Sequence, residues 1–238
     1  MTIDHLPGFR RHFRVRPGPD RVVAALEDDI HRMMVALVHD GETITSVEVM
    51  QERVPWNMCP GSMERLQNDF VGLPISGVGR RLDKKANCTH LFDLAGLALR
   101  HAFDEGEAYY EILVSDPVDG ANSAVLRRNG EDRLLWQIAD DVIILPEAAA
   151  GLALIGLRPW IESLGPEDRH LARMLQWAAL VSHGRHMPWE TDANMRALPG
   201  SCFASQPGRH EKCQRTGERI DFSKPDARPP LAGMGFGV

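Results

Sequence analysis

The sequence lacks the features that mark several large classes of protein. Its 238 residues contain no apolar run of the roughly 18 residues that a membrane span needs, and the opening MTIDHLPGFRRHFRVR has no apolar stretch of the secretory type. We therefore expect a soluble, cytoplasmic protein with no membrane partner. Basic residues are scattered among acidic ones and the formal net charge is −6, so no basic stripe is available for phosphates. Nucleic acid is not expected to be a partner, and no nucleotide cofactor is indicated.

Cysteine is scarce, and its spacing is not that of a common metal-binding module. The cysteines form no paired C-x-x-C knuckles, which an ordinary zinc finger requires. In a reducing compartment such residues are more often free thiols, metal ligands or nucleophiles than disulfides. Their spacing alone leaves their role open; they are Cys59, Cys88, Cys202 and Cys213.

The first half of the sequence predicts strands followed by two helices. Residues 11–55 alternate apolar and polar side chains at period two between tight turns, which indicates an antiparallel meander. A short helix is then expected over 63–70, capped by Ser62. A second helix, capped by Asn87 or Thr89, carries an apolar stripe along one side.

The second half indicates further strands or buried segments and one well-marked helix. Residues 109–116 and 134–145 are rich in apolar side chains and are bounded by turn residues. Residues 165–184 predict a helix, because Pro166 stands at its start, acids fill its first turn and an apolar stripe follows.

These patterns predict an α+β fold, with an antiparallel sheet and helices packed on one face. Residues 1–186 are expected to form a single domain. Residues 187–238 are rich in Pro, Gly, Arg and Ser with little periodicity, so we expect an extended tail that wraps the domain or is partly disordered. Homo-oligomerisation is left open.

Chemically active side chains stand at the starts of the predicted elements. Cys59 lies just ahead of the first helix, and Cys88 and His90 open the second, where the positive end of the helix dipole favours a thiolate. His31 follows an acidic pair in the turn before a central strand, so it can reach the end of the sheet where the helices begin. Together they would make a tetrahedral set for zinc or ferrous iron, consisting of His31, Cys59, Cys88 and His90. Alternatively, three of them bind the metal and one position stays open for a substrate.

Each of these residues also has a purely structural explanation. A free cysteine is often buried simply as a small apolar group. A histidine at a helix start is commonly a cap or a hydrogen-bonded surface residue. A core in which no metal binds therefore stands beside the metal site as an alternative.

Aromatic and methionine side chains supply candidates for a substrate pocket. Trp56 and Met58 could hold aromatic rings, and so could Tyr110. Tyr109 could donate a proton near such a pocket. Residues of these types are more often part of a core than of a site.

Four segments resemble the bacterial family called domain of unknown function 2889. They are IHRMMVAL, VPWNMCPG, GLPISG and NCTHLFDLAGLAL, and the Cys-Thr-His-Leu helix start is the most specific of them. The resemblance covers about residues 10 to 110, and the segment SCFASQPGRHEKCQRTGERIDFS is similar to the tail of longer members.

A more remote likeness is to the U-type iron-sulfur cluster scaffold proteins. In that comparison Cys59 falls at the middle cysteine of the scaffold, Cys88 and His90 fall at its His-Cys pair, and His31 lies near its first Cys-x-Asp. The first cysteine is missing here and the His/Cys order is reversed, which puts cluster assembly in doubt.

The family resemblance implies a lyase, because its long members are associated with bacterial aromatic catabolism, in which lignin-derived dimers lose formaldehyde from a hydroxymethyl arm. Such a lyase needs a base, a proton donor and an apolar pocket. His31 or His90, directly or through a metal-bound hydroxide, is the candidate base, and Tyr109 or Tyr110 is the candidate donor. The alternative is a non-catalytic scaffold or carrier that binds zinc or iron.

Overall fold

The chain forms two compact units, which are described separately. The computed structural model describes residues 3–77, 82–189 and 199–235. The predicted tail from residue 187 contributes to both units, and its residues 190–198 and 236–238 lie outside the described ones. Unit 1 comprises Met1–His12, Tyr109–Met187 and Ile220–Ala232, and unit 2 comprises Phe13–Ala108, Pro188–Arg219 and Gly233–Val238.

Antiparallel strands and the helices that pack against them define an α+β fold, as the sequence predicts. The hydrogen-bonded order of the strands is β4-β3-β2-β1-β5-β6-β7-β8. Strand β1 (Gly8–Pro17) contributes its first half to unit 1 and its second half to unit 2. The other strands are β2 (Arg21–Asp28), β3 (Arg32–His39), β4 (Ile44–Arg53), β5 (Ala108–Ser115), β6 (Ala121–Arg128), β7 (Glu131–Ala139) and β8 (Val142–Leu145).

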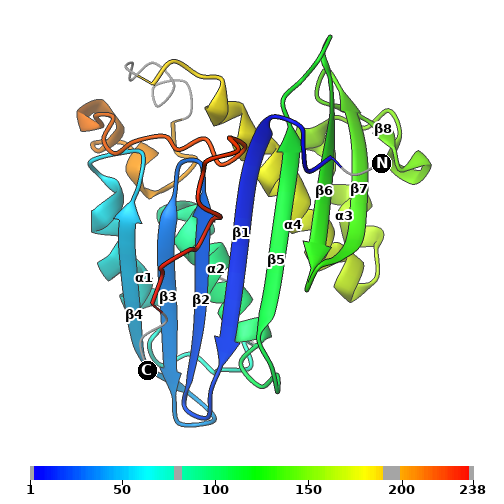
Figure 1. The fold of residues 1–238 in the computed structure, drawn as a ribbon. Coiled ribbons are helices and arrows are strands. Elements are labelled where there is room, and N and C mark those ends of the chain that lie inside the picture. The colour runs from blue at the N-terminus through cyan, green and yellow to red at the C-terminus, as the bar shows by residue number, and fades with distance from the viewer. Residues whose placement is uncertain (1–2, 78–81, 190–198, 236–238) are drawn as a thin grey trace. The chain divides into compact units, whose positions relative to one another are not determined.

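Unit 2 is built on the meander of β2, β3 and β4, which confirms the strands predicted there. Strand β2 is buried from Val22 to its last residue, because neighbours cover both its faces. Helix α2 (Thr89–Arg100) packs on β2 and β3, and α1 (Ser62–Phe70) packs on β4 (Figure 1). The turn from β2 to β3 and the start of α2 are the parts of this unit that carry the candidate site.

The starts of α1 and α2 differ by one residue from the prediction. The N-cap of α1 is Gly61, and Ser62 is the first helical residue, whose hydroxyl donates to the carbonyl of Cys59 at 2.6 Å. The N-cap of α2 is Cys88, between the two predicted caps. The side chain of Asn87 donates instead to Asp69 at 2.8 Å, so it is held away from the helix end.

Unit 1 contains the meander of β5 to β8 with two helices against it, α3 (Arg158–Ser163) and α4 (Pro166–Ser182). Helix α4 begins at Pro166 and buries one apolar side, as the sequence predicts. The predicted segment 134–145 is a hairpin, which turns at Asp140 and Asp141 with positive φ angles of 47° and 62°. Within the described ranges, no helix is long and apolar enough to cross a membrane.

Candidate metal centre

The turn between β2 and β3 buries a carboxylate that is held by its own backbone. Oδ1 of Asp28 accepts hydrogen bonds from the N–H groups of Ile30 at 2.8 Å and His31 at 2.7 Å. The same oxygen lies 3.0 Å from Nδ1 of the His31 ring. Aspartate favours such tight turns because its side chain can replace a backbone acceptor. Since Asp28 is completely buried, its carboxylate has a fixed position.

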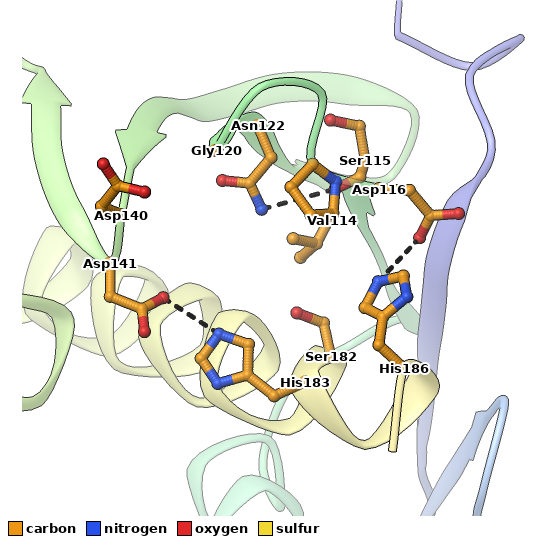
Figure 2. Close-up of a pocket in the computed structure, with 11 residues that line it drawn as sticks. Val114, Ser115, Asp116, Gly120, Asn122, Asp140, Asp141, Ser182, His183 and His186 are labelled. Atoms are coloured by element: carbon orange, nitrogen blue, oxygen red, sulfur yellow. Dashed lines mark hydrogen bonds and ion pairs between the residues drawn. The ribbon is translucent and has the colours of Figure 1, made fainter. Parts of the chain in front are cut away.

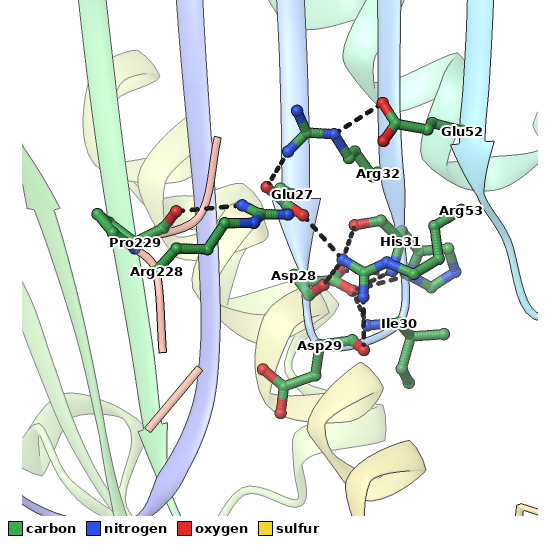
Figure 3. A network of polar contacts seen from close by, with 10 residues as sticks. All are labelled: Glu27, Asp28, Asp29, Ile30, His31, Arg32, Glu52, Arg53, Arg228 and Pro229. Atoms are coloured by element: carbon green, nitrogen blue, oxygen red, sulfur yellow. Dashed lines mark hydrogen bonds and ion pairs between the residues drawn. The ribbon is translucent and has the colours of Figure 1, made fainter. Parts of the chain in front are cut away.

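The guanidinium of Arg53, at the end of β4, holds the turn from the other side (Figure 3). Its Nη2 donates to the carbonyls of Asp28 at 2.8 Å and His31 at 3.3 Å. Its Nη1 donates to the carbonyl of Asp29 at 3.1 Å. The planar arginine fork has several fixed donors, which suits it to this task. The backbone of the turn is therefore tied to a neighbouring strand.

A buried glutamate balances the charge of this arginine. Glu27 is completely buried, and its carboxylate accepts from Arg53 at 3.0 Å and from Arg32 at 2.6 Å. Arg32 also donates to Glu52 at 2.8 Å. Burying a charge without a partner would destabilise the folded state by roughly several kcal/mol. The carboxylate of Glu27 avoids this penalty because two arginines pair with it. The turn thus rests on a neutralised ionic network (Figure 3).

His90, in the first turn of α2, lies against His31. The ring centroids are 3.9 Å apart and the ring planes are inclined by 30°. The donor atoms of Asp28, His31 and His90 all lie within 4.8 Å of one another. In the described ranges they are the one group of three or more His, Cys, Asp or Glu residues with this spacing. We call it the Asp–His group.

This group has the chemistry of a divalent metal centre. Two imidazoles and one carboxylate form the donor set of many ferrous enzymes, and zinc accepts the same ligands. Because Nδ1 of His31 faces Asp28, a proton on that nitrogen leaves Nε2 as the ring's acceptor. Asp28 is completely buried and His31 is 5% exposed, whereas His90 is half-buried. The group therefore opens toward solvent at His90.

Cys59 and Cys88 lie near each other outside the Asp–His group. Burial raises the pKa of Cys59 well above its usual value, and the neighbouring Cys88 raises it further. Burial likewise raises the pKa of Cys88 to about 11, although the N–H groups of Leu91 and His90 favour the thiolate. The sequence predicts thiolates at these helix starts. Burial opposes that expectation, because desolvation raises both pKa values by more than the helix start lowers them.

The remaining cysteines come from the C-terminal segment and join these thiols. Cys213 packs beside Cys59 in a buried apolar cluster, and Cys202 packs against the same cluster. We call the four cysteines the thiol cluster. The predicted metal ligands therefore fall into two groups: His31 and His90 lie with Asp28, while Cys59 and Cys88 lie with Cys202 and Cys213.

The predicted ring-binding residues of unit 2 also lie at the thiol cluster. Trp56 is buried there and Met58 packs against it, partly buried. The guanidinium of Arg215 covers the Trp56 ring, with its central carbon 3.9 Å from the ring centroid. The indole is thus stacked against a cation from the C-terminal segment.

The predicted tyrosines lie in unit 1. The hydroxyl of Tyr109 is 2.5 Å from Nδ1 of His12, and the two rings meet edge to face. Tyr110 is completely buried, with its ring edge-on to His170 and Arg128 over its face.

Unit 1 also holds a polar pocket with two aspartate–histidine pairs (Figure 2). Nε2 of His183 lies 3.0 Å from Asp141, and Nε2 of His186 lies 3.2 Å from Asp116. The hydroxyl of Ser182, which lines the pocket, donates to a carbonyl of its own helix at 2.7 Å. It is therefore not aligned with either imidazole as a nucleophile would be.

Sequence reasoning missed three contributors to the two groups. Asp28 was visible as the first residue of an Asp-x-x-His turn, a spacing that allows its carboxylate to reach the histidine N–H. Cys202 and Cys213 carry no comparable local signal.

Fold and site together define an α+β protein with a buried carboxylate–imidazole group where a strand turn meets a helix start. Residues 14–103, from β1 to just past α2, match the family model described as protein of unknown function (DUF2889). The family resemblance is confirmed for that range, which includes the Asp–His group but neither Cys202 nor Cys213. No curated protein matches the sequence. The likeness to iron-sulfur scaffolds stays a prediction.

Proposed function

We propose that this protein is a metal-dependent carbon–carbon lyase that acts on a small aromatic substrate. The observation that carries the proposal is the buried Asp–His group, whose donor atoms lie within 4.8 Å of one another. Zinc and ferrous iron are the metals that this donor set suits. The substrate class, lignin-derived aromatic dimers with a hydroxymethyl arm, comes from the family resemblance.

Burial of the donors favours a lyase over the alternative, a non-catalytic metal scaffold or carrier. A carrier must present its ligands to a partner protein, but Asp28 is completely buried and His31 nearly so. Only the half-buried His90 offers surface, among the three residues of the group. A small molecule can approach such a group more readily than the surface of a protein can.

The proposed reaction is redox-neutral and needs no second reactant. The hydroxyl of the hydroxymethyl arm loses its proton to a base, and its oxygen becomes the carbonyl oxygen of formaldehyde. The carbon–carbon bond to the arm breaks, and its electron pair forms a carbon–carbon double bond in the remaining dimer. An oxygen substituent on the adjacent carbon departs and takes up a proton from a donor.

The residues of the Asp–His group have distinct tasks in this reaction. A bound metal would increase the acidity of the substrate hydroxyl. Asp28 fixes the ring of His31 through the 3.0 Å contact at Nδ1, so the ring cannot turn away. His90 reaches solvent, which allows the proton to leave the site. The roles of Tyr109 as donor, and of Trp56, Met58 and Tyr110 as ring contacts, stay predictions.

The test is a screen of aromatic dimers that carry a hydroxymethyl arm, with the release of formaldehyde as the readout. The full chain is assayed as purified, after removal of metal, and after reloading with zinc or ferrous iron. We expect release that disappears on stripping, returns on reloading, and is lost in His90→Ala. Bound metal with no release from any dimer would favour the carrier, and failure to bind either metal would contradict both functions.

A further inference from the structure

The four cysteines of the chain are neighbours in one region of unit 2, outside the Asp–His group. Cys59 opens a short 3-10 turn (Cys59–Gly61) ahead of α1, and Cys88 is the N-cap of α2. Cys202 and Cys213 flank two such turns in the C-terminal segment, Phe203–Ser205 and His210–Lys212. None of the four is in a disulfide, and three of the four are buried.

Hydrogen bonds between two chain segments hold Cys213 next to Cys59. The N–H of Asn57 donates to the carbonyl of Gln214 at 3.1 Å, and the N–H of Gln214 donates to Oδ1 of Asn57 at 2.9 Å. The N–H of Thr216 donates to the carbonyl of Pro55 at 3.0 Å. This strand-like pairing positions the C-terminal segment beside the chain that leads into α1.

A second set of hydrogen bonds holds Cys202 next to Cys88. The N–H of Phe203 donates to the carbonyl of Asn87 at 2.9 Å, so the residues adjacent to both cysteines are paired. The side chain of Gln206 donates to the carbonyl of Lys85 at 2.9 Å. The segment that carries the last two cysteines is therefore docked twice, once at each of the first two.

Hydrogen bonds also fix the backbone at Cys202, and the start of α2 favours a thiolate at Cys88. The N–H of Ser205 donates to the carbonyl of Cys202 at 3.1 Å, and the hydroxyl of Ser205 accepts from the N–H of Cys202 at 2.8 Å. Cys88 is the N-cap of α2, where the N–H groups of Leu91 and His90 lower the pKa of its thiol against the effect of burial. N–H groups near a sulfur stabilise a metal-bound thiolate.

We infer that the thiol cluster is a structural zinc site, with Cys59, Cys88, Cys202 and Cys213 as its ligands. Four thiols from separate segments form the closed donor set of structural zinc, which leaves no position for a substrate. No three of these sulfur atoms lie within 4.8 Å of one another, so binding requires the segments that carry them to close around the ion. It would thereby fasten the C-terminal segment to the strands and helices of unit 2. The site is separate from the proposed lyase centre, and its test does not need lyase activity.

Cobalt substitution tests this site directly. The full chain is stripped of metal and loaded with Co²⁺, and the near-ultraviolet absorption is recorded, because thiolate ligands give an intense sulfur-to-cobalt charge-transfer band and imidazole or carboxylate ligands do not. We expect a band with the intensity of about four thiolates. Cys202→Ser and Cys213→Ser should each weaken it, while Met58→Leu, at a side chain that packs on the cluster without ligating, should leave it intact. His31→Ala should leave it intact too.

A second measurement uses the protein without substitutions, so the inference can be tested even if a cysteine variant does not fold. The thiols are titrated with a chromogenic disulfide in the folded protein, with one equivalent of Zn²⁺ and with a chelator. We expect all the thiols to react at least about tenfold more slowly with zinc. Equal reactivity in both conditions, without a charge-transfer band, would overturn the inference. A full band in Cys202→Ser and Cys213→Ser would overturn the part assigned to the C-terminal segment.

Discussion

The imidazole of His31 lies against that of His90 in a tilted arrangement, with 3.9 Å between ring centroids and 30° between ring planes. His31 comes from the turn before β3 and His90 from the first turn of α2, so the contact joins the sheet to the helix at their ends. In the proposed metal centre, these two imidazoles and the buried carboxylate beside them would hold a cation. Asp28 supplies the negative charge that such a cation requires.

We predict that Asp28→Asn lowers the affinity for zinc or ferrous iron by at least about tenfold. Metal affinity falls by this much even when only a hydrogen-bonding partner of a metal ligand is removed. The amide keeps an oxygen that can accept the N–H groups of Ile30 and His31, so the turn should persist. It removes the charge. Competition with a chelator of known affinity measures the effect.

Asp40→Asn is a matched control for that variant. Asp40 makes the same kind of turn after β3, where its Oδ1 accepts from the N–H groups of Glu42 at 3.0 Å and Thr43 at 2.7 Å. It lies outside the Asp–His group, so metal affinity should not change. Equal losses of affinity in both variants would show that the metal does not bind at Asp28.

Arg53→Met should destabilise unit 2 by about 3 kcal/mol, the lower end of the cost of breaking a buried ion pair. The change removes one of the two partners of Glu27 and the donors to three carbonyls of the turn. Urea unfolding, followed by tryptophan fluorescence, measures the free energy of unfolding.

Arg21→Met removes an arginine of the same sheet from an exposed pair. Arg21 donates to Glu48 at 2.8 Å, but the Glu48 side chain is 53% exposed. Water screens such a pair, so the loss should stay below about 1 kcal/mol. If Arg53→Met lowers the free energy of unfolding by an equally small amount, the turn between β2 and β3 does not depend on the guanidinium of Arg53.

The strands of unit 2 were predictable because their signals are local. Alternation at period two and turn residues between apolar runs are properties of neighbouring residues, and they locate β1 to β4 without any knowledge of partners. The helix starts were missed by one residue, because a cap is defined by backbone angles. Cys88 is extended at its own position and is not among the usual capping residues.

The candidate site was only partly predictable, because its residues meet through tertiary contacts. His31 and His90 come together as the turn and helix-start positions suggest. The position of Cys213 depends on two hydrogen bonds between Gln214 and Asn57, one between backbone groups and one to the Asn57 side chain, and residue types alone do not show which segments pair. The C-terminal segment has little periodicity, so neither its path nor its docking could be derived from the sequence.

Glu111→Gln should stabilise the protein at neutral pH. Glu111 pairs across β5 and β6 with Arg127. Burial raises the pKa of Glu111, while the charge of Arg127 acts in the opposite direction. A raised pKa means that the folded state holds the proton more tightly than the unfolded state, so stability falls as the pH rises through this pKa. Glutamine removes that penalty.

Glu111→Gln should increase the free energy of unfolding at about pH 7. The increase should be absent at about pH 4, where the glutamate of the unfolded chain also begins to bind its proton. Urea unfolding of both proteins at the two pH values gives the comparison. A variant that is less stable than the parent at neutral pH would show that the attraction of Arg127 outweighs burial.

Gly217→Ala should release the C-terminal segment from the chain that precedes α1, whereas Gly208→Ala should not. Both glycines have positive φ angles, +70° and +82°, so each substitution carries a backbone cost of about 1 kcal/mol. A Cβ at Gly217 would stand 2.7 Å from the carbonyl oxygen of Val54, but at Gly208 it would meet no atom within 4 Å. Only the first substitution forces two backbones apart.

The thiol of Cys213 reports this separation, because it is buried where the segment is docked. In metal-free protein we expect Gly217→Ala to speed the labelling of Cys213 at least about tenfold, as local opening becomes easier, with little change in Gly208→Ala. Mass spectrometry of the labelled peptide separates Cys213 from the other thiols. Equal labelling of Cys213 in the two variants would mean that the C-terminal segment stays docked even when a Cβ separates Gly217 from Val54.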